Sequence, residues 1–436
     1  MQSAAGWSEY LISMIPMNKT ICISAAMLLA GVFAIFGQNT QTPYSMYGYG
    51  ILGDRATSMQ RQMGSVGYAM NSGRQVNVMN PASYAATDSL TFLFDLGADV
   101  SMIWSQEGSA KRYATGGGVD YATMQFPLGK HFGGSIGLLP YSSVGYAFGN
   151  EIKHGTMENQ GSGGINELYL GLAGEIKGFS LGFNISYAFG NIVNDVFSTP
   201  TGQTQTKFEH LMEIRDWNIL IGAQYTLRPD RFNKFVVGVT YSPKKTLLGS
   251  SSATTQEMTK DSEPRTVGEL KLRNNYYTPN IIGAGLSYTY EKSYKVSAEF
   301  DFTWQGWKDC KYSAMYATED PERIVFAGMD FNNRTRYAAG LEIIPRIRGN
   351  YGQRITYRIG GYYTNDYLKI QGNSVREYGI TAGFGFPTPE GRTMVNLGLE
   401  WKHRQASPVK LIGENYLNVT LGVNFNEVWF FKRKIR

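Results

Sequence analysis

The stretch VSAEFDFTWQGW, Val296–Trp307, alternates apolar and polar side chains with a period of two. Val296, Ala298 and Phe300 fall on one face, and Ser297 and Glu299 fall on the other. Successive side chains of a strand point to opposite faces, so the pattern predicts a β-strand with one apolar and one polar face. The strand is longer than the roughly 5–6 residues usual in soluble sheets and suits a tilted membrane-spanning strand of ~9–11 residues.

The same alternation recurs along most of the chain. Outward apolar stripes are expected at 92–104, 179–189, 217–227, 395–401 and 417–425. About 14 strands are predicted, an even number as in bacterial outer-membrane barrels. Their expected spans are 89–104, 111–127, 131–148, 164–177, 179–190, 207–227, 233–244, 268–290, 292–307, 334–345, 354–367, 374–386, 392–404 and 414–426.

The connections alternate between short turns and long loops. PLGKH and KGF are short, whereas Lys245–Gly268 and Lys308–Asn333 are long. Short periplasmic turns and long outer loops are typical of outer-membrane barrels. The chain is therefore predicted to be all-β, a transmembrane antiparallel β-barrel over residues 89–426, in the cell outer membrane with both termini periplasmic. A soluble β-sandwich also alternates, but its strands are shorter.

The beginning of the chain has the layout of an export signal. Residues 17–37 combine Lys19 with an apolar run from Ile21 to Phe36, as in a secretory signal peptide. Residues 1–16 fit neither the signal nor the segment after it, which suggests a mis-assigned start and translation from Met17. A retained N-terminal anchor is the alternative.

Residues 38–88 lie between the signal and the first strand and lack the alternation of a wall strand. They are rich in Gly, Ser, Asn and Tyr. We expect them to fold into the barrel as an N-terminal plug, since larger barrels are often plugged. A disordered periplasmic segment is the alternative. The end of the chain, 427–436, is expected to be a basic periplasmic tail.

Little in the sequence favours an enzyme. The spacing of Gly48, Gly50 and Gly53 matches a dinucleotide-binding turn without its strand–helix context. GGSIG, Gly133–Gly137, matches a nucleophile elbow, but Ser135 falls in mid-strand. The four His and two Cys residues show no metal-ligand spacing. No catalytic residue, metal, cofactor or nucleic-acid partner is therefore expected.

An N-terminal plug containing NPAS, with the motif Asn80, Pro81 and Ala82, followed by about 14 strands, resembles the FadL-type outer-membrane transporters of hydrophobic compounds (the OmpP1, FadL and TodX group). The segments QTPYSMYGYGILGD and ENYLNVTLGVNFNEVWFFKRK are similar to a Bacteroidota-like branch of that family. The resemblance implies passive uptake of hydrophobic small molecules, such as long-chain fatty acids. It also leaves open a role as a shuttle or docking component in protein secretion, with secreted protein partners bound by the long loops.

The resemblance further implies a lateral exit at a kink in the third strand. Pro140 lies in the middle of that strand, where it cannot donate to the ladder. Gly133, Ser135, Gly137, Ser143, Gly145 and Ala147 are expected on its inward face. The lateral-opening candidates are Pro140, Gly137 and Ser143, and a simple bulge is the alternative.

Charged side chains are expected on the inner face, including Asp95, Asp99, Glu175, Asp216, Lys295, Glu299, Asp301, Arg336, Glu342, Arg354, Arg358, Glu400 and Lys402. Most are expected to pair with one another or with the plug. Arg354 and Arg358 are the first candidates for an anionic head group, because guanidinium presents a fork to a carboxylate. An apolar ligand-binding pocket is expected from the plug residues Tyr44, Tyr47, Tyr49, Met63 and Tyr68.

Overall fold

The structure is a computed structural model that describes residues 42–152, 155–202, 204–258, 263–273, 276–317, 322–389 and 392–428. The proposed start at 1–16, the signal at 17–37 and all but the first two residues of the tail at 427–436 lie outside these ranges. Among the described helices, none is long and apolar enough to cross a membrane.

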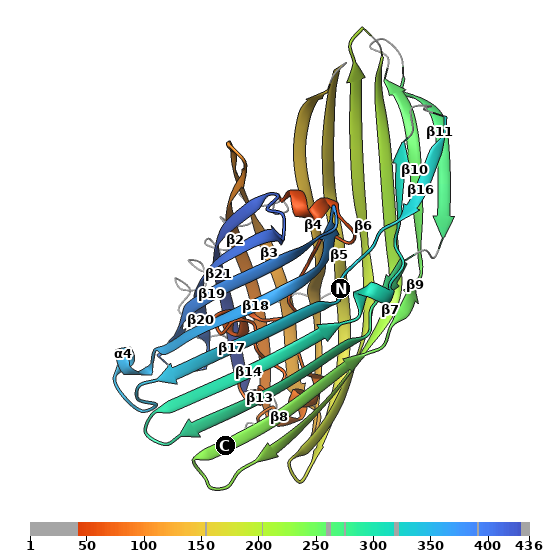
Figure 1. The fold of residues 1–436 in the computed structure, drawn as a ribbon. Coiled ribbons are helices and arrows are strands. Elements are labelled where there is room, and N and C mark those ends of the chain that lie inside the picture. The colour runs from red at the N-terminus through yellow and green to blue at the C-terminus, as the bar shows by residue number, and fades with distance from the viewer. Residues whose placement is uncertain are drawn as a thin grey trace, which may run out of the picture. The chain divides into compact units, whose positions relative to one another are not determined.

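Fourteen strands form a closed antiparallel barrel, which confirms the predicted fold (Figure 1). Strands that follow one another in the barrel pair as hairpins, and β2 pairs with β21 to close it. The barrel strands are β2 (Thr91–Glu107), β3 (Ala110–Pro127), β4 (Phe132–Ile152), β5 (Gly155–Ile176), β6 (Phe179–Pro200), β7 (Gln205–Leu227), β8 (Asn233–Ser242), β13 (Ile281–Glu291), β14 (Lys295–Gln305), β17 (Arg334–Ile344), β18 (Thr356–Ile370), β19 (Asn373–Pro387), β20 (Met394–Ser407) and β21 (Gly413–Val428).

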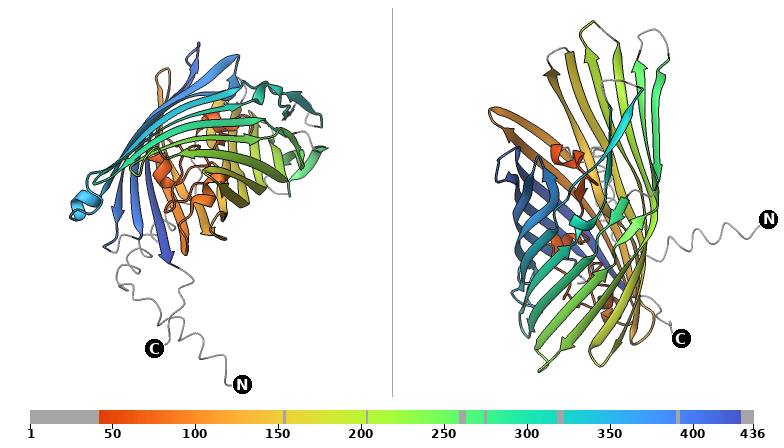
Figure 2. Two further views of the ribbon diagram at one scale, coloured as in Figure 1. Left: turned by 90° about the horizontal axis from the view of Figure 1, so that it is seen from below. Right: turned by 45° about the vertical axis from the view of Figure 1, so that its right-hand side comes forward.

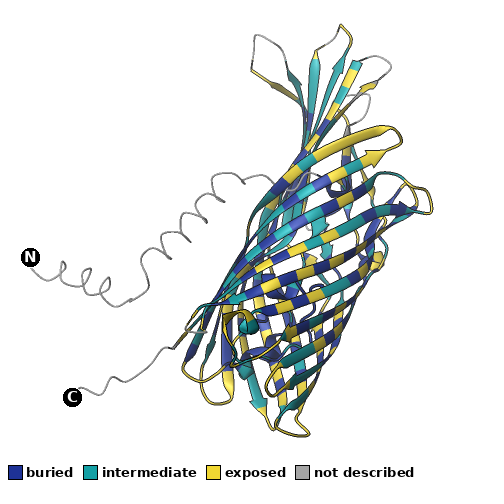
Figure 3. Cartoon of the chain, turned by 90° about the vertical axis from the view of Figure 1, so that its left-hand side faces the viewer, coloured by how far each residue is buried: buried dark blue, intermediate teal, exposed yellow. Residues whose placement is uncertain are grey.

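Burial alternates along the wall strands, as Figure 3 shows. In β6, Leu181, Phe183 and Ile185 are exposed, whereas the side chains between them are buried. In β6 the exposed side chains are those of the predicted stripe at 179–189, whereas in the stripe at 92–104 Ala98 is buried. An apolar outer face of this kind suits contact with lipid, as in outer-membrane barrels.

The four neighbouring strands β4 to β7 continue well beyond the band of exposed apolar side chains on the outer face of the barrel, which we call the apolar belt. In β5 the outward residues change from Leu170 and Leu168 to Asn166, Gln160 and Glu158. The upper part of β7 then pairs with β10 (Gly249–Met258), which pairs with β11 (Arg265–Arg273). The extended parts of β4 to β7, together with β10 and β11, form the tall sheet on one side of Figure 1, which we call the protruding sheet. From Asn166 to Glu158, β5 extends by about 26 Å along the strand, at ~3.3 Å per residue.

The predicted single strand over 268–290 was therefore wrong. It divides into β11, the short β12 (Tyr276–Thr278) and the wall strand β13, with Pro279 and Asn280 immediately before β13. The predicted loop Lys245–Gly268 likewise contains β9 (Lys245–Leu247), which pairs with β12, and β10. The loop Lys308–Asn333 carries the end of η3 (Trp307–Asp309) and the hairpin of β15 (Ser313–Ala317) with β16 (Ile324–Gly328).

Residues 42–90 lie inside the wall, and we call them the plug (Figure 2). Their elements are η1 (Pro43–Met46), β1 (Ile51–Leu52), α3 (Ser58–Arg61) and η2 (Pro81–Ala86). The plug is well packed, with Tyr49, Val66, Val76 and Tyr84 at 0–1% exposure. It therefore forms part of the core of the folded protein.

Two local expectations were wrong. In β4 the register shifts between Pro140 and Ser142, so Tyr141 is an extra residue and the alternation reverses beyond it. Val144 and Tyr146 enter the core, in place of the expected Ser143, Gly145 and Ala147. Arg354 does not begin a strand; it ends the helix α4 (Tyr351–Arg354), which Asn350 caps, and β18 begins only at Thr356.

Candidate interior site and lateral break

The predicted plug motif anchors the plug to the wall. Asn80 accepts a hydrogen bond from the Ala82 N–H (3.1 Å) and caps η2, and its Nδ2 donates to Tyr68 O (2.7 Å) and Ala223 O (3.2 Å). A Cβ on wall residue Gly222 would collide with Asn80 and Pro81. The side chain of Asn80 therefore joins two parts of the plug to β7, a role that needs both an amide donor and an acceptor.

Inward-facing wall glycines give the plug backbone its space. A Cβ on Gly182 would lie 2.6 Å from the carbonyl of Pro81, and one on Gly238 or Gly360 would meet the backbone at Tyr68 or Met63. Real Cβ atoms do not approach backbone so closely. The wall therefore holds the plug in a groove that only glycine allows.

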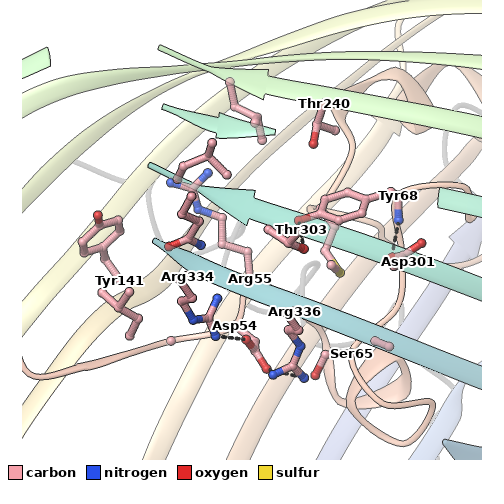
Figure 4. A pocket seen from close by; sticks show the side chains of 17 residues that line it. Asp54, Arg55, Ser65, Tyr68, Tyr141, Thr240, Asp301, Thr303, Arg334 and Arg336 are labelled. Atoms are coloured by element: carbon pink, nitrogen blue, oxygen red, sulfur yellow. Dashed lines mark hydrogen bonds and ion pairs between the residues drawn. The ribbon is translucent and has the colours of Figure 1, made fainter. Parts of the chain in front are cut away.

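Two wall carboxylates also hold the plug. Asp301 Oδ2 accepts from the N–H groups of Gly67 (2.7 Å) and Tyr68 (3.0 Å), and Figure 4 shows the contact with Tyr68. Glu299 Oε1 accepts from Ala69 N (2.8 Å). Tyr68 also hydrogen-bonds Thr303 (2.9 Å), and burial raises the pKa of this phenol to about 12. A turn of consecutive N–H groups is a natural partner for a carboxylate.

Three charged plug residues pair with the wall. Asp54 lies 3.1 Å from Arg336 and 3.7 Å from Arg334, which come from β17 (Figure 4). Arg55 pairs with Glu167 at 2.7 Å, and Arg61 pairs with Asp120 at 2.5 Å. Burial alone would raise the pKa of Asp54, but the charges of Arg336 and Arg334 outweigh it and leave that pKa below its ordinary value.

The ladder between β3 and β4 stops part-way up the wall. Their pairing runs from Pro127 opposite Gly133 to Ala122 opposite Leu138 and goes no further. Just beyond, each strand carries an extra residue: Tyr141 in β4, and Asp120 in β3 where its register with β2 shifts. We call this interruption the lateral break.

The plug covers the edge of β4 at the lateral break. Ile51 and Leu52 of β1 lie opposite Ser143 and Ser142 as an antiparallel pair. Gly53 N donates to Tyr141 O (2.8 Å), and Thr42 N donates to Gly145 O (2.7 Å). The glycine-rich stretch that includes Gly50 and Gly53 thus serves as a partner strand, and a Cβ on Gly50 would strike Ser143.

Two polar cavities lie behind the lateral break. The first, of about 80 Å³, is lined by Asp54, Arg55, Tyr68, Arg334 and Arg336 among others (Figure 4). The second, of about 200 Å³, shares Asp54 and both arginines and reaches Pro140, Ser142 and Ser143. We call this second cavity the charged cavity. Both are smaller than the ~300–1,000 Å³ of ordinary ligand pockets.

The five predicted apolar pocket residues are divided among three places in the structure. Tyr44 and Tyr49 are buried in the largest core cluster, with Tyr47 packed against it. Met63 packs in a separate cluster with Val66 and Tyr362. Tyr68 lines the first cavity.

Tyr49 is central to an aromatic cluster under the long loops. Its ring centroid is 5.4 Å from that of Trp307 and 5.2 Å from that of Tyr312. Its hydroxyl donates to Tyr277 O (3.0 Å) and accepts from Tyr277 N (2.9 Å). The plug and the loops are therefore joined by packed aromatic side chains.

The two predicted head-group arginines lie apart from the charged cavity. Arg358 bonds Glu342 (2.7 Å), Asn396 (2.8 Å) and the plug residue Gln62 (2.9 Å), so its donors are engaged. Arg354 stacks over Tyr351 in the turn between β17 and β18. Of the other predicted inner charges, Lys295 pairs with Glu342, and Asp216 pairs with Lys245.

Among the described residues, no group of three or more His, Cys, Asp or Glu side chains could hold a metal ion. Ser135 of the GGSIG stretch hydrogen-bonds Met124 O (2.7 Å) and the Tyr169 hydroxyl (2.8 Å). Both of its contacts lie within the wall, where Ser135 is fully buried.

A family of known sequences matches nearly the whole chain. The profile of the family described as BamG matches residues 17–436. The chain belongs to the BamG family. No curated protein matches it.

Solved structures show which barrels the BamG-family chain resembles. The Ralstonia pickettii toluene transporter TbuX superposes with a TM-score of 0.61 at 12% identity, over 85% of this chain and 98% of that one. The Pseudomonas putida toluene transporter TodX gives 0.59 at 13%, over 87% and 100%. A Pseudomonas aeruginosa FadL homologue gives 0.57 at 10%, over 87% and 100%. At these identities the likeness establishes the FadL-type fold that the sequence predicted.

Several residues of the interior site were missed from the sequence of this BamG-family chain. Asp54, Arg61 and Asp120 border the lateral break, yet none was among the candidates. A signal was available for the first two: charges are rare in the plug, and a charge carried into a barrel interior requires a partner. Asp120 carried no such signal, because it faces inward only through the irregular register of β3.

Proposed function

We propose that the protein passes hydrophobic small molecules through the outer membrane and releases them sideways at the lateral break. The observation that carries the proposal is the end of the β3–β4 ladder at Ala122 and Leu138, directly in front of the charged cavity. A molecule leaving there enters the bilayer without crossing the turn end of the barrel. The FadL-type fold supports this route, and Pro140, Gly137 and Ser143 lie along it.

The plug must give way for passage to occur. In the described state β1 occupies the edge of β4, and the aromatic cluster joins the plug to the loops. Neither cavity holds more than a small group, so a ligand has to displace β1 or the chain around Tyr49. We propose that this displacement is the gating step, and that the chain contains no energy source for it. Both termini are proposed to face the periplasm, with the protruding sheet outside.

The decisive experiment restores the wall. Pro140→Val supplies the backbone N–H that proline lacks, and deletion of Tyr141 removes the extra residue. With both changes, β3 and β4 can pair further up the wall. Pro127→Val is the matched control, because Pro127 belongs to the intact part of the same ladder. Uptake of radiolabelled oleate and dodecanol is measured in cells that carry each variant. We expect several-fold slower uptake in the variant with the restored wall than in the parent protein or the Pro127→Val control. Equal uptake in these three proteins would refute lateral release.

A second function, docking in protein secretion, is favoured by the protruding sheet. Its outward residues, such as Glu158, Gln160 and Ser162, are exposed and polar, unlike the belt below. Exposed strands and loops carried on a rigid scaffold are common binding surfaces. A photo-crosslinker at Gln160 should capture a discrete exported protein in living cells, and one at Leu170 in the belt should not. Equal labelling at both positions would argue against docking.

A further inference from the structure

Six carboxylates and five basic residues line the charged cavity, so its formal charge is negative by one. Each base lining it has a carboxylate partner: Arg334 and Arg336 contact Asp54, Arg61 contacts Asp120, and Lys402 and Arg404 contact Glu377. Within the described part of the chain, three further lining carboxylates have no Lys, Arg or His nitrogen within 4 Å. These are Asp99, Asp366 and Glu400. The surplus charge in the cavity is therefore negative.

Two of these carboxylates belong to a polar row that crosses three adjacent strands. Ser101 of β2 lies opposite Asn418 of β21, and Asn418 lies opposite Glu400 of β20. Asn418 Nδ2 donates to Glu400 (2.7 Å), and Ser101 Oγ contacts Asp99 (3.4 Å). Directly opposed side chains in a sheet are ~5 Å apart, so the row offers its oxygens side by side.

Unpartnered acceptors on the same cavity give an independent sign of a ligand. Asn418 Oδ1 and Ser142 Oγ make no hydrogen bond within the described residues, although the two residues are only 8% and 4% exposed. The amide orientation of Asn418 is set by Glu400, which requires the NH₂ group as its donor. The oxygen is thereby left as a free acceptor, and buried polar groups ordinarily have partners.

Among the described residues, no cation forms an ion pair with Asp99 or Glu400, although Arg61 and Lys402 interact with Asp99, and Arg336 with Glu400, from beyond 4 Å. Lys402 Nζ lies 3.8 Å from Glu377 and 4.5 Å from the centre of the Tyr416 ring, and Arg61 is engaged by Asp120. Within the described ranges, the hydrogen-bond donors to Glu400 are the neutral groups of Tyr362 (2.5 Å) and Asn418 (2.7 Å). The row thus presents two carboxylates, an amide oxygen and a hydroxyl, a set of acceptors that matches a group with several N–H donors and a positive charge.

We propose that this polar row binds the protonated amine of an amphiphile whose apolar tail extends through the lateral break. A cavity of about 200 Å³ accommodates such a head group and leaves no space for the tail. Pro140, Ser142 and Ser143 line the same cavity, so the tail has a short path to the wall. The inference rests on the proposed function and specifies its substrate class. An acidic surplus disfavours a fatty-acid carboxylate at this place.

The test compares three probes with the same tail. Binding of octylammonium, octanoate and octanol to the barrel in lipid nanodiscs is measured by calorimetry. Charge-assisted hydrogen bonds to buried carboxylates predict that octylammonium binds at least about tenfold more tightly than octanol. Asp99→Asn with Glu400→Gln should abolish that preference, and Ser142→Ala should weaken it several-fold. Asp95→Asn, on the same strand and face but outside the cavity and bonded to Tyr121 and Asn424, should leave it unchanged.

Two results would overturn the inference: equal binding of the three probes, or a preference for octylammonium that survives in the Asp99–Glu400 double variant. Heat-modifiable migration of each variant verifies that the barrel is folded. Dodecanol uptake that depends on the lateral break, without any preference for octylammonium, would leave the proposed function intact and refute only the amine site. An octylammonium site with no such uptake would refute lateral release and retain the site.

Discussion

Ile51 of the plug lies opposite Ser143 of β4, on the strand edge that β3 leaves beyond Leu138. The short pairing of Ile51 and Leu52 with Ser143 and Ser142 thus covers this edge from within, where a neighbouring wall strand would otherwise do so. An exposed strand edge in a bilayer carries a heavy penalty, since lipid offers no hydrogen bonds. The plug segment therefore has two roles, as an interior filling and as a removable partner strand.

A disulfide between β1 and β4 tests whether β1 must leave the edge of β4 during uptake. Ile51→Cys with Ser143→Cys, in a Cys310→Ser background, places two cysteines at paired positions whose Cα separation permits a disulfide. We expect the oxidised protein to lose uptake of dodecanol and the reduced protein to regain it. A lock at Leu93 and Gln125, paired residues of the intact β2–β3 ladder, serves as the control and should have no effect. Unchanged uptake in the oxidised Ile51–Ser143 variant would mean that β1 stays in place.

A single added methyl group should dislodge part of the plug. In β18, a Cβ on Gly360 would strike the backbone of Met63 and Gly64, whereas one on Gly361 would meet only Gly379 O at 3.3 Å. We expect Gly360→Ala to expose the plug to trypsin at Arg61 while the barrel remains folded, with overpacking of about 1–3 kcal/mol. Gly361→Ala should resist trypsin like the parent protein. Equal resistance of both variants would contradict the glycine groove.

The buried pair of Arg358 and Glu342 is expected to stabilise the fold. The Arg358 side chain has no solvent exposure, and Glu342 lies 2.7 Å from it and 2.8 Å from Lys295. Glu342→Gln leaves the arginine without a charge partner and should lower the free energy of unfolding by about 3–5 kcal/mol. Lys295→Met, which removes the more exposed partner, should lower it by about 1 kcal/mol or less. Urea denaturation in detergent measures both, and a near-neutral Glu342→Gln would free Arg358 for a ligand role.

The ion pairs of Asp54 should make stability depend on acid pH. Its pKa is lowered in the folded protein, so its contribution is present above the ordinary carboxyl pKa near 3.9 and is lost as the pH falls through the lower folded value. At neutral pH, Asp54→Asn should lower the free energy of unfolding by about 1–3 kcal/mol. Below about pH 4 the difference between parent and variant should shrink toward zero. A difference that stayed constant with pH would show that charge is not its source.

The alternation of side chains was sufficient to predict the wall, because each strand faces lipid on one side and the plug on the other. It failed in β4, where the extra residue Tyr141 shifts the register against β5, a feature of strand pairing that the local pattern does not contain. Two other errors had readable signals. Asn350 and Gln353 form the capping box of α4, and Pro279 with Asn280 precedes β13.

The candidate site was less predictable than the wall. Asp54, Arg61 and Asp120 meet only when the plug lies inside the barrel, so their association depends on contacts between distant parts of the chain. The plug tyrosines were predicted to line one pocket because they are close in sequence. In the structure Tyr44, Tyr47 and Tyr49 pack in one cluster, whereas Tyr68 lines the first cavity.

The seam between β2 and β21 restricts how this chain can be built. It joins the first wall strand to the last, from Thr91 opposite Val428 to Gln106 opposite Gly413, and the plug directly precedes β2. If β2 and β21 paired before the plug was inside, the plug would have to enter the closed barrel through one of its ends. Biogenesis must therefore proceed with the plug already laid along the growing wall. The pairing of β2 with β21 then closes the barrel around the plug.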